Sequence, residues 1–270
     1  PLLDTELVNH TQTLMTDGLN RMQKLMRMRA RPKVLLATDF EEGERLLERY
    51  LENLMGVIVD ANFPREGESD ASAGVAFAEL VRERAPDRPV LMQSSDQKNA
   101  QRMAEIGCLF VNKRADTLLH DVRHFLREHL GFGDFVFRTP DGSAVATARD
   151  LRAFHERVAE VPGESILHHG RRNDFSTWLQ ARTEFELSRE IRPVRASEFA
   201  GAEDLRAYLL EHLDEHRQRR RAGVVAEFSS GTFEGTGGFV RIGSGSLGGK
   251  GRGLAFINAL IEEYDLASHL

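Results

Sequence analysis

Short apolar runs alternate with segments of helical period from residue 33 to residue 130, and this alternation is the strongest constraint on the fold. The apolar runs are residues 33–38, 55–59, 89–94 and 109–112, and the helical segments are residues 41–54, 73–85, 97–106 and 116–130. Strands that alternate with helices of this length indicate right-handed crossovers and a parallel sheet covered on both faces. We therefore predict an α/β fold, a doubly wound parallel sheet that ends near Leu130.

Three of these predicted strands end in polar side chains that suit phosphoryl chemistry. Asp60 directly follows the second run, Ser94 is the last residue of the third, and Lys113 directly follows the fourth. Because the carboxyl ends of parallel strands meet at one edge of an open sheet, we expect these three side chains to converge. A carboxylate can attack phosphorus, and hydroxyl and cationic groups stabilise the oxygens that are transferred. Each residue also has a structural interpretation, as a turn former, a helix cap or a solvated charge.

The order of elements and these strand-end residues resemble a response-regulator receiver domain, a flavodoxin-like fold, over residues 2–130. The resemblance implies a two-component phosphorelay in which a histidine kinase or another phosphotransferase donor phosphorylates Asp60. It also implies a bound Mg²⁺, held by Asp60 and by the backbone carbonyl of Asn62. The other residues that it assigns are the switch hydroxyl Ser94, the aromatic switch residue Phe110 and the lysine Lys113.

The sequence departs from the receiver pattern in two places. Arg114 stands where the family has proline after its lysine, and no pair of acids that would hold the metal is visible before Asp60. Asp39 is too close to Asp60 to end the first strand, because two crossovers and a strand do not fit between them. We therefore expect residues 33–38 to form the second strand and Asp39 to lie in the turn into the second helix. The first strand, with its acids, would then precede Pro1.

The pattern changes after residue 130. Residues 135–146 predict two strands around a Pro-Asp-Gly turn, and helical spacing predicts helices at 148–160, 175–191 and 202–221. We therefore divide the chain into three parts, a receiver-like domain (1–130), a smaller mixed α+β connector (131–237) and a C-terminal segment (238–270). The C-terminal segment contains a predicted strand at 238–242, a glycine-rich stretch and an apolar helix.

The glycine-rich stretch from Gly248 to Ala255 resembles the opening of the ATP-binding domain of pyruvate phosphate dikinase and phosphoenolpyruvate synthase. The resemblance implies that Gly248 and Gly249 form a turn from which Lys250 reaches the phosphates of ATP. The pattern GxGxxG at residues 243–248 is weak by itself, and the residues around Lys250 fail the Walker A pattern. We expect the segment to belong to a larger phosphotransferase that the receiver regulates, and we do not expect these residues alone to catalyse its reaction.

Two alternatives to a phosphorylated receiver remain. Residues 2–30 place apolar side chains, many of them methionine, along one helical face. A degenerate receiver that serves as an interaction or homodimerisation module, without phosphorylation, is the first alternative. The second is an ATP-binding fragment that uses Lys250.

Composition limits the classes of partner. The 270 residues carry a net charge of -6, which gives no bulk attraction to nucleic acid or to anionic lipid. The single cysteine, Cys108, rules out an internal disulfide and fits a cytoplasmic location, and no apolar run has the length of a membrane span. We interpret the basic run at 216–221 as a helix end, and His168 and His169 as structural or surface groups and not as a metal pair.

Overall fold

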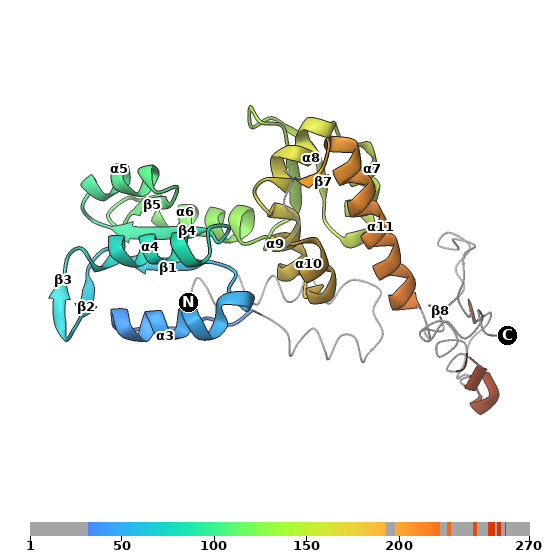
Figure 1. Cartoon of the computed structure of the whole chain (residues 1–270), viewed down its shortest axis with the longest axis horizontal. Coiled ribbons are helices and arrows are strands. Elements are labelled where there is room, and N and C mark those ends of the chain that lie inside the picture. The colour runs from blue at the N-terminus through green and yellow to red at the C-terminus, as the bar shows by residue number, and fades with distance from the viewer. Residues whose placement is uncertain are drawn as a thin grey trace. The chain divides into compact units, whose positions relative to one another are not determined.

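The computed structural model describes residues 32–192, 198–221, 226–227, 240–241, 248–251, 253–254 and 257. The chain consists of two compact units, Pro1–Arg206 and Ala207–Leu270, whose elements are labelled in Figure 1. The helix predicted at residues 2–30 and the strand expected before Pro1 lie outside the described residues.

Among the described residues, three parallel strands form the largest sheet of the first unit. In their order across the sheet they are β1 (Val57–Asp60), β4 (Val90–Ser94) and β5 (Leu109–Asn112). Asp60 is paired with Gln93, and Ser94 is paired with Asn112, so the carboxyl ends of the strands meet at one edge. The α/β class with parallel strands, predicted from the alternation in the sequence, is confirmed.

Helices cover both faces of this sheet (Figure 1). One face carries α3 (Phe40–Tyr50, extended by the 3-10 turn Leu51–Asn53), α4 (Ala73–Arg84) and α5 (Lys98–Glu105). The other face carries α6 (Leu118–His124) and the π-helical segment η2 (Phe125–His129). Along β4, Val90 and Met92 pack in the first core and Leu91 packs in the second. Burial on both faces explains why the strands are continuous apolar runs.

The strand predicted at residues 33–38 is not present. Residues 32–37 have no regular secondary structure, and the side chains of Val34, Leu35 and Leu36 are 54%, 48% and 78% exposed. A strand needs a neighbour to satisfy its backbone hydrogen bonds. Within the described part of the chain, β1 pairs with β4 alone and residues 33–38 pair with no strand, so their strand-forming composition is not enough by itself.

A hairpin lies between β1 and α4. Its antiparallel strands are β2 (Phe63–Arg65) and β3 (Glu68–Asp70). Glu66 and Gly67 connect them with φ angles of 54° and 80°, as a two-residue hairpin turn requires. The ring of Phe63 packs against Phe40 and Phe77, at centroid distances of 6.3 Å and 6.2 Å. These aromatic contacts hold the hairpin against α3 and α4.

A second group of elements follows residue 130 in the first unit. They are β6 (Phe135–Arg138), β7 (Ala144–Ala148), α7 (Leu151–Glu160), α8 (Gly163–Gly170), α9 (Asp174–Ala181) and α10 (Phe185–Ile191). The antiparallel pairing of β6 with β7 confirms the predicted hairpin. The helix predicted at 175–191 is broken, because Thr183 between α9 and α10 adopts a φ of 64°. The sequence analysis did not predict α8.

Buried Arg88 joins the sheet to these later helices. Its guanidinium donates to Gln180 Oε1 at 3.2 Å and to the carbonyl oxygen of Glu52 at 3.0 Å. Gln180 in turn donates to the carbonyl oxygen of Asn53 at 3.2 Å. Burial, and to a lesser extent Arg192, lower the pKa of Arg88 to about 9, so the guanidinium stays charged at neutral pH. These contacts lie beside the amino end of β4.

The second unit contains most of α11 (Ala202–Arg221), which has the bounds predicted from the sequence. Its described strands are β8 (Ala226–Glu227) and β9 (Val240–Arg241), which pair in parallel. β9 lies inside the predicted strand 238–242, whose other residues are outside the described part. None of the helices in the described residues combines the length and the apolar character needed to span a membrane.

Candidate functional site

The carboxylate of Asp60 and the ammonium of Lys113 form an ion pair at the carboxyl edge of the sheet. Asp60 is the last residue of β1, Lys113 directly follows β5, and β4 lies between these strands. The side chains therefore meet across the end of β4. They are 46% and 37% exposed, so a ligand can reach both from solvent. The structure thus brings together the carboxylate and the ammonium that the sequence placed at separate strand ends.

Ser94 ends the middle strand between these two groups. Its carbonyl oxygen accepts a hydrogen bond from the amide of Lys113 at 2.9 Å. Its hydroxyl oxygen accepts from the Asp96 amide and from Asn99 Nδ2, both at 3.0 Å. The hydroxyl therefore stabilises the turn into α5, in agreement with the structural interpretation of Ser94. Ser94 is 4% exposed, and because these contacts use its oxygen as acceptor, the hydroxyl proton is left for another acceptor.

Helix α4 begins directly behind Asp60. The amide of Gly74 donates to the carbonyl oxygen of Ala61 at 3.1 Å. A Cβ atom on Gly74 would lie 2.2 Å from the carbonyl oxygen of Asp60 and 2.6 Å from the Cα of Ala61. Only glycine permits this approach of the helix to the strand end. Sequence reasoning did not identify Gly74, although a glycine in the first turn of a predicted helix was a visible signal.

The other residues near Asp60 make the following contacts, and their assigned roles stay predictions. The amide of Asn62 donates to Asp60 Oδ1 at 3.4 Å. Asp39 is the N-cap of α3 and accepts from the amide of Glu42 at 2.8 Å, which confirms its predicted place in the turn. Phe110 is partly buried and packs against the core that contains α3, α4 and α5.

The oxygens of Asp60 and of the Asn62 backbone are the donors assigned to a divalent cation. Oxygen donors suit Mg²⁺, which is commonly held by one or two carboxylates and completes its coordination with water and substrate phosphate. Within the described residues, no group of three or more His, Cys, Asp or Glu side chains is placed to hold a metal. The donor set fits a cation that binds together with a phosphate.

An apolar groove of about 230 Å³ lies beside β1. Its lining includes Leu36, Leu46 and Ile58, and Asp39 and Asp60 also contribute to it. This groove lies between residues 35–37 and β1. The strand expected before Pro1, and the acids that would end it, stay predictions.

The second predicted site contains Gly248, Gly249 and Lys250, which belong to the second unit. Gly249 and Lys250 have helical backbone geometry. A Cβ atom on Gly248 or Gly249 would meet no heavy atom within 4 Å, so the described residues give no steric reason for glycine there. The assignment of Lys250 to ATP stays a prediction.

Of the adjacent histidines His168 and His169 in α8, His169 has a structural role. His169 is 5% exposed, its Nδ1 lies 2.7 Å from Asp174 Oδ2, and its Nε2 accepts the amide of Arg138 at 2.8 Å. Both ring nitrogens are therefore engaged by the protein. This confirms the structural interpretation of His169 and argues against its use as a metal ligand.

No protein-family model, curated protein or solved structure matches this chain. The functional assignment therefore depends on the geometry at the carboxyl edge of the sheet and on the residue resemblances found in the sequence.

Proposed function

We propose that this chain is a receiver-like regulatory module with a flavodoxin-like fold, in which Asp60 accepts a phosphoryl group. The observation that carries the proposal is the ion pair between Asp60 and Lys113, with Ser94 at the strand end between them. The exposed carboxylate is accessible to a protein donor. In this proposal the ammonium would balance the charge that a phosphoryl group brings, and the hydroxyl would donate a hydrogen bond to it.

In the proposed reaction, a carboxylate oxygen of Asp60 attacks the phosphorus of a phosphohistidine on a histidine kinase or of a small acyl phosphate. The donor's bond to phosphorus breaks, its electron pair leaves with the donor, and an aspartyl phosphate forms. Lys113, now paired with Oδ2, would bind the new phosphate oxygens, and the Ser94 hydroxyl would donate to one of them. Asp60 and the Asn62 carbonyl would hold Mg²⁺, whose charge favours binding of the phosphate.

The proposed output is control of a downstream phosphotransferase similar to phosphoenolpyruvate synthase or pyruvate phosphate dikinase. Three described features would carry a change at the carboxyl edge toward the helices after residue 130. The amide of Lys113 is bonded to Ser94, so movement of one residue affects the other. Phe110 lies on β5 and packs into the core, where it can respond to that movement. Arg88 and Gln180 join the sheet to the helices that follow it.

The decisive experiment is intact-mass analysis after incubation with acetyl phosphate and Mg²⁺. We expect one phosphoryl adduct on the wild-type chain and none on Asp60→Asn. Asp116→Asn is the matched control, because it removes an exposed carboxylate close to Lys113 in sequence without touching the ion pair. An adduct that persists in Asp60→Asn, or wild-type protein that stays unmodified, would contradict the proposal.

A further inference from the structure

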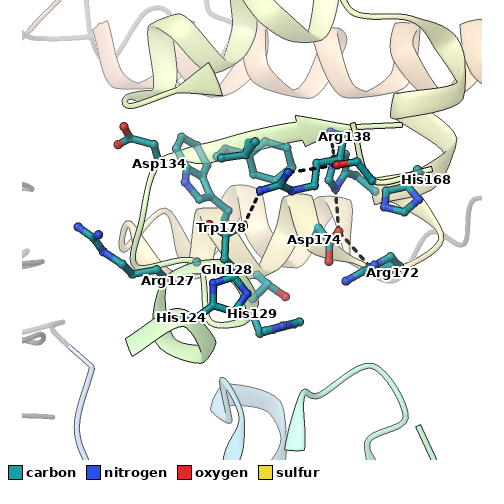
Figure 2. A pocket seen from close by; sticks show the side chains of 16 residues that line it. His124, Arg127, Glu128, His129, Asp134, Arg138, His168, Arg172, Asp174 and Trp178 are labelled. Carbon is teal, nitrogen blue, oxygen red and sulfur yellow. Dashed lines mark hydrogen bonds and ion pairs between the residues drawn. The ribbon is translucent and has the colours of Figure 1, made fainter. Parts of the chain in front are cut away.

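A second cavity, of about 300 Å³, lies in the first unit where η2, the β6–β7 hairpin, α8 and α9 meet (Figure 2). Its size is at the lower end of the range for small-molecule sites. Unlike the groove beside β1, it is rich in imidazole and guanidinium groups. Figure 2 shows His129, His168 and Arg172 around one hollow, whereas Arg127 and Asp134 lie apart from them in this view.

A hydrogen bond between His169 and Asp174 connects α8 to α9 at the cavity wall. Because Nε2 of His169 accepts the Arg138 amide, its proton lies on Nδ1 and is donated to Asp174. Asp174 also contacts Arg172 Nε at 3.4 Å. The buried imidazole therefore fixes the carboxylate, and the carboxylate holds Arg172 at the cavity. Arg172 is itself 52% exposed and remains accessible to a ligand.

Strand β6 places a second guanidinium, that of Arg138, at the cavity. Arg138 Nη1 donates to the Gly142 carbonyl at 3.3 Å, and Arg138 Nη2 lies 3.4 Å from Glu128 Oε2. Each of the two arginines is thus held by one carboxylate through a single long contact. A guanidinium has five N–H donors, so both retain donors that can point to a ligand.

The charge of the hollow depends on its histidines. Arg138 and Arg172 are balanced by Glu128 and Asp174 while the imidazoles are neutral. Besides His169, the other titratable groups that line the cavity are His124 of α6, His129 of η2 and His168 of α8, with Arg127 and Asp134 further away. Protonation of these imidazoles would therefore leave the hollow positive.

Two of the histidines resist protonation while the hollow holds no anion. Burial lowers the pKa of His129, and Arg172 and His124 lower it further, although Asp174 and Glu128 oppose them. Burial likewise lowers the pKa of His168, with His169 and Arg172 adding to the effect and Asp174 opposing it. A bound anion would oppose this lowering of the pKa, because it would favour the charged imidazole.

We propose that this cavity binds a small doubly charged oxyanion, of the phosphate-monoester class. Arg138 and Arg172 supply planar donors that match tetrahedral oxyanions. His129 and His168 supply further donors and take up protons as the anion binds. This inference does not depend on phosphorylation of Asp60, since none of its residues belongs to that site.

The test is isothermal titration calorimetry of the 270-residue chain with glycerol 3-phosphate, and with sulfate as a probe whose charge does not change with pH. We expect saturable binding of both, with sulfate affinity rising as the pH falls from 8 to 5.5 and the imidazoles become protonated. His168→Gln should weaken this pH dependence. Acetate, with a single charge, should compete poorly.

Arg172→Gln should lower the affinity for both anions about tenfold or more, since it removes a charged hydrogen-bond donor. The matched control is Arg157→Gln, because Arg157 pairs with Glu160 on α7 and does not line the cavity. Thermal unfolding of each variant verifies that it is folded. Absence of saturable binding in the wild type, equal affinities of Arg172→Gln and Arg157→Gln, or equal competition by acetate would overturn the proposal.

Discussion

Replacement of Gly74 by alanine tests whether helix α4 is fitted to the end of β1. The added methyl group would lie 2.2 Å from the Asp60 carbonyl oxygen, 2.6 Å from the Ala61 Cα and 2.9 Å from the Ala61 carbonyl carbon. All three are backbone atoms, so no side-chain rotation relieves the overlap. The helix and the strand end must move apart by roughly 1 Å to restore ordinary contact.

Two opposing contributions determine the size of the effect. Alanine is favoured over glycine within a helix by about 1 kcal/mol. Against this, overpacking costs about 1–3 kcal/mol. Separation would also weaken the hydrogen bond from the Gly74 amide to Ala61, which contributes about 1 kcal/mol. We therefore expect Gly74→Ala to lower the free energy of unfolding by about 1–3 kcal/mol.

Urea denaturation followed by circular dichroism measures this change. The midpoint should fall while the slope stays the same. Gly201→Ala is the matched control, because its Cβ would meet no heavy atom within 4 Å, and we expect a change below about 0.5 kcal/mol. A Gly74→Ala protein as stable as the wild type would refute the close approach of α4 to Asp60.

Three further predictions follow from ionic contacts. Lys113→Gln should change the free energy of unfolding by less than about 1 kcal/mol, because its ion pair is exposed, but it should reduce the acetyl phosphate adduct seen by mass spectrometry. Arg88→Met should cost about 1–3 kcal/mol in urea denaturation, since it leaves the buried acceptor of Gln180 without its donor. Burial alone would raise the pKa of Asp87, but Arg192 and Arg88 lower it on balance below 3.8. The contribution of the ionised Asp87 to the free energy of unfolding is therefore complete above pH 3.8, and it is lost as the pH falls through the lower pKa of the folded protein. When the free energy of unfolding is measured as a function of pH, Asp87→Asn should lose less stability than the wild type below pH 3.8.

The sheet and its polar edge were predictable because local sequence determines them. Val57 to Asp60 and Val90 to Ser94 are apolar runs ending in a polar residue, and parallel pairing necessarily brings such ends together. The predicted convergence of Asp60 and Lys113 needed no knowledge of the loops between the strands. The bounds of α11 were equally local, because residues 202–221 keep helical spacing without a breaker.

The features that were wrongly predicted or missed depend on contacts with residues far away in the sequence. Residues 33–38 have strand composition, but their structure depends on a paired strand that composition does not reveal. The break at Thr183 has no glycine or proline to mark it. The imidazole-rich cavity combines residues of η2 with residues of α8, which are far apart in the sequence. His129 and His168 each appeared unremarkable until the fold placed them at one hollow.

Arg88 connects the amino end of β4 to a helix that follows residue 130. β4 starts two residues after Arg88, which is hydrogen-bonded to Gln180. It ends at Ser94, at the carboxyl edge of the sheet that carries Asp60 and Lys113. It is bonded on both sides, to β1 and to β5, so it is held against bending within the sheet plane. Under the proposed function, phosphorylation of Asp60 would act at the Ser94 end of β4, and a helix that follows residue 130 is hydrogen-bonded to Arg88 next to its other end. β4 would then relate the occupancy of the site to helices that do not touch it.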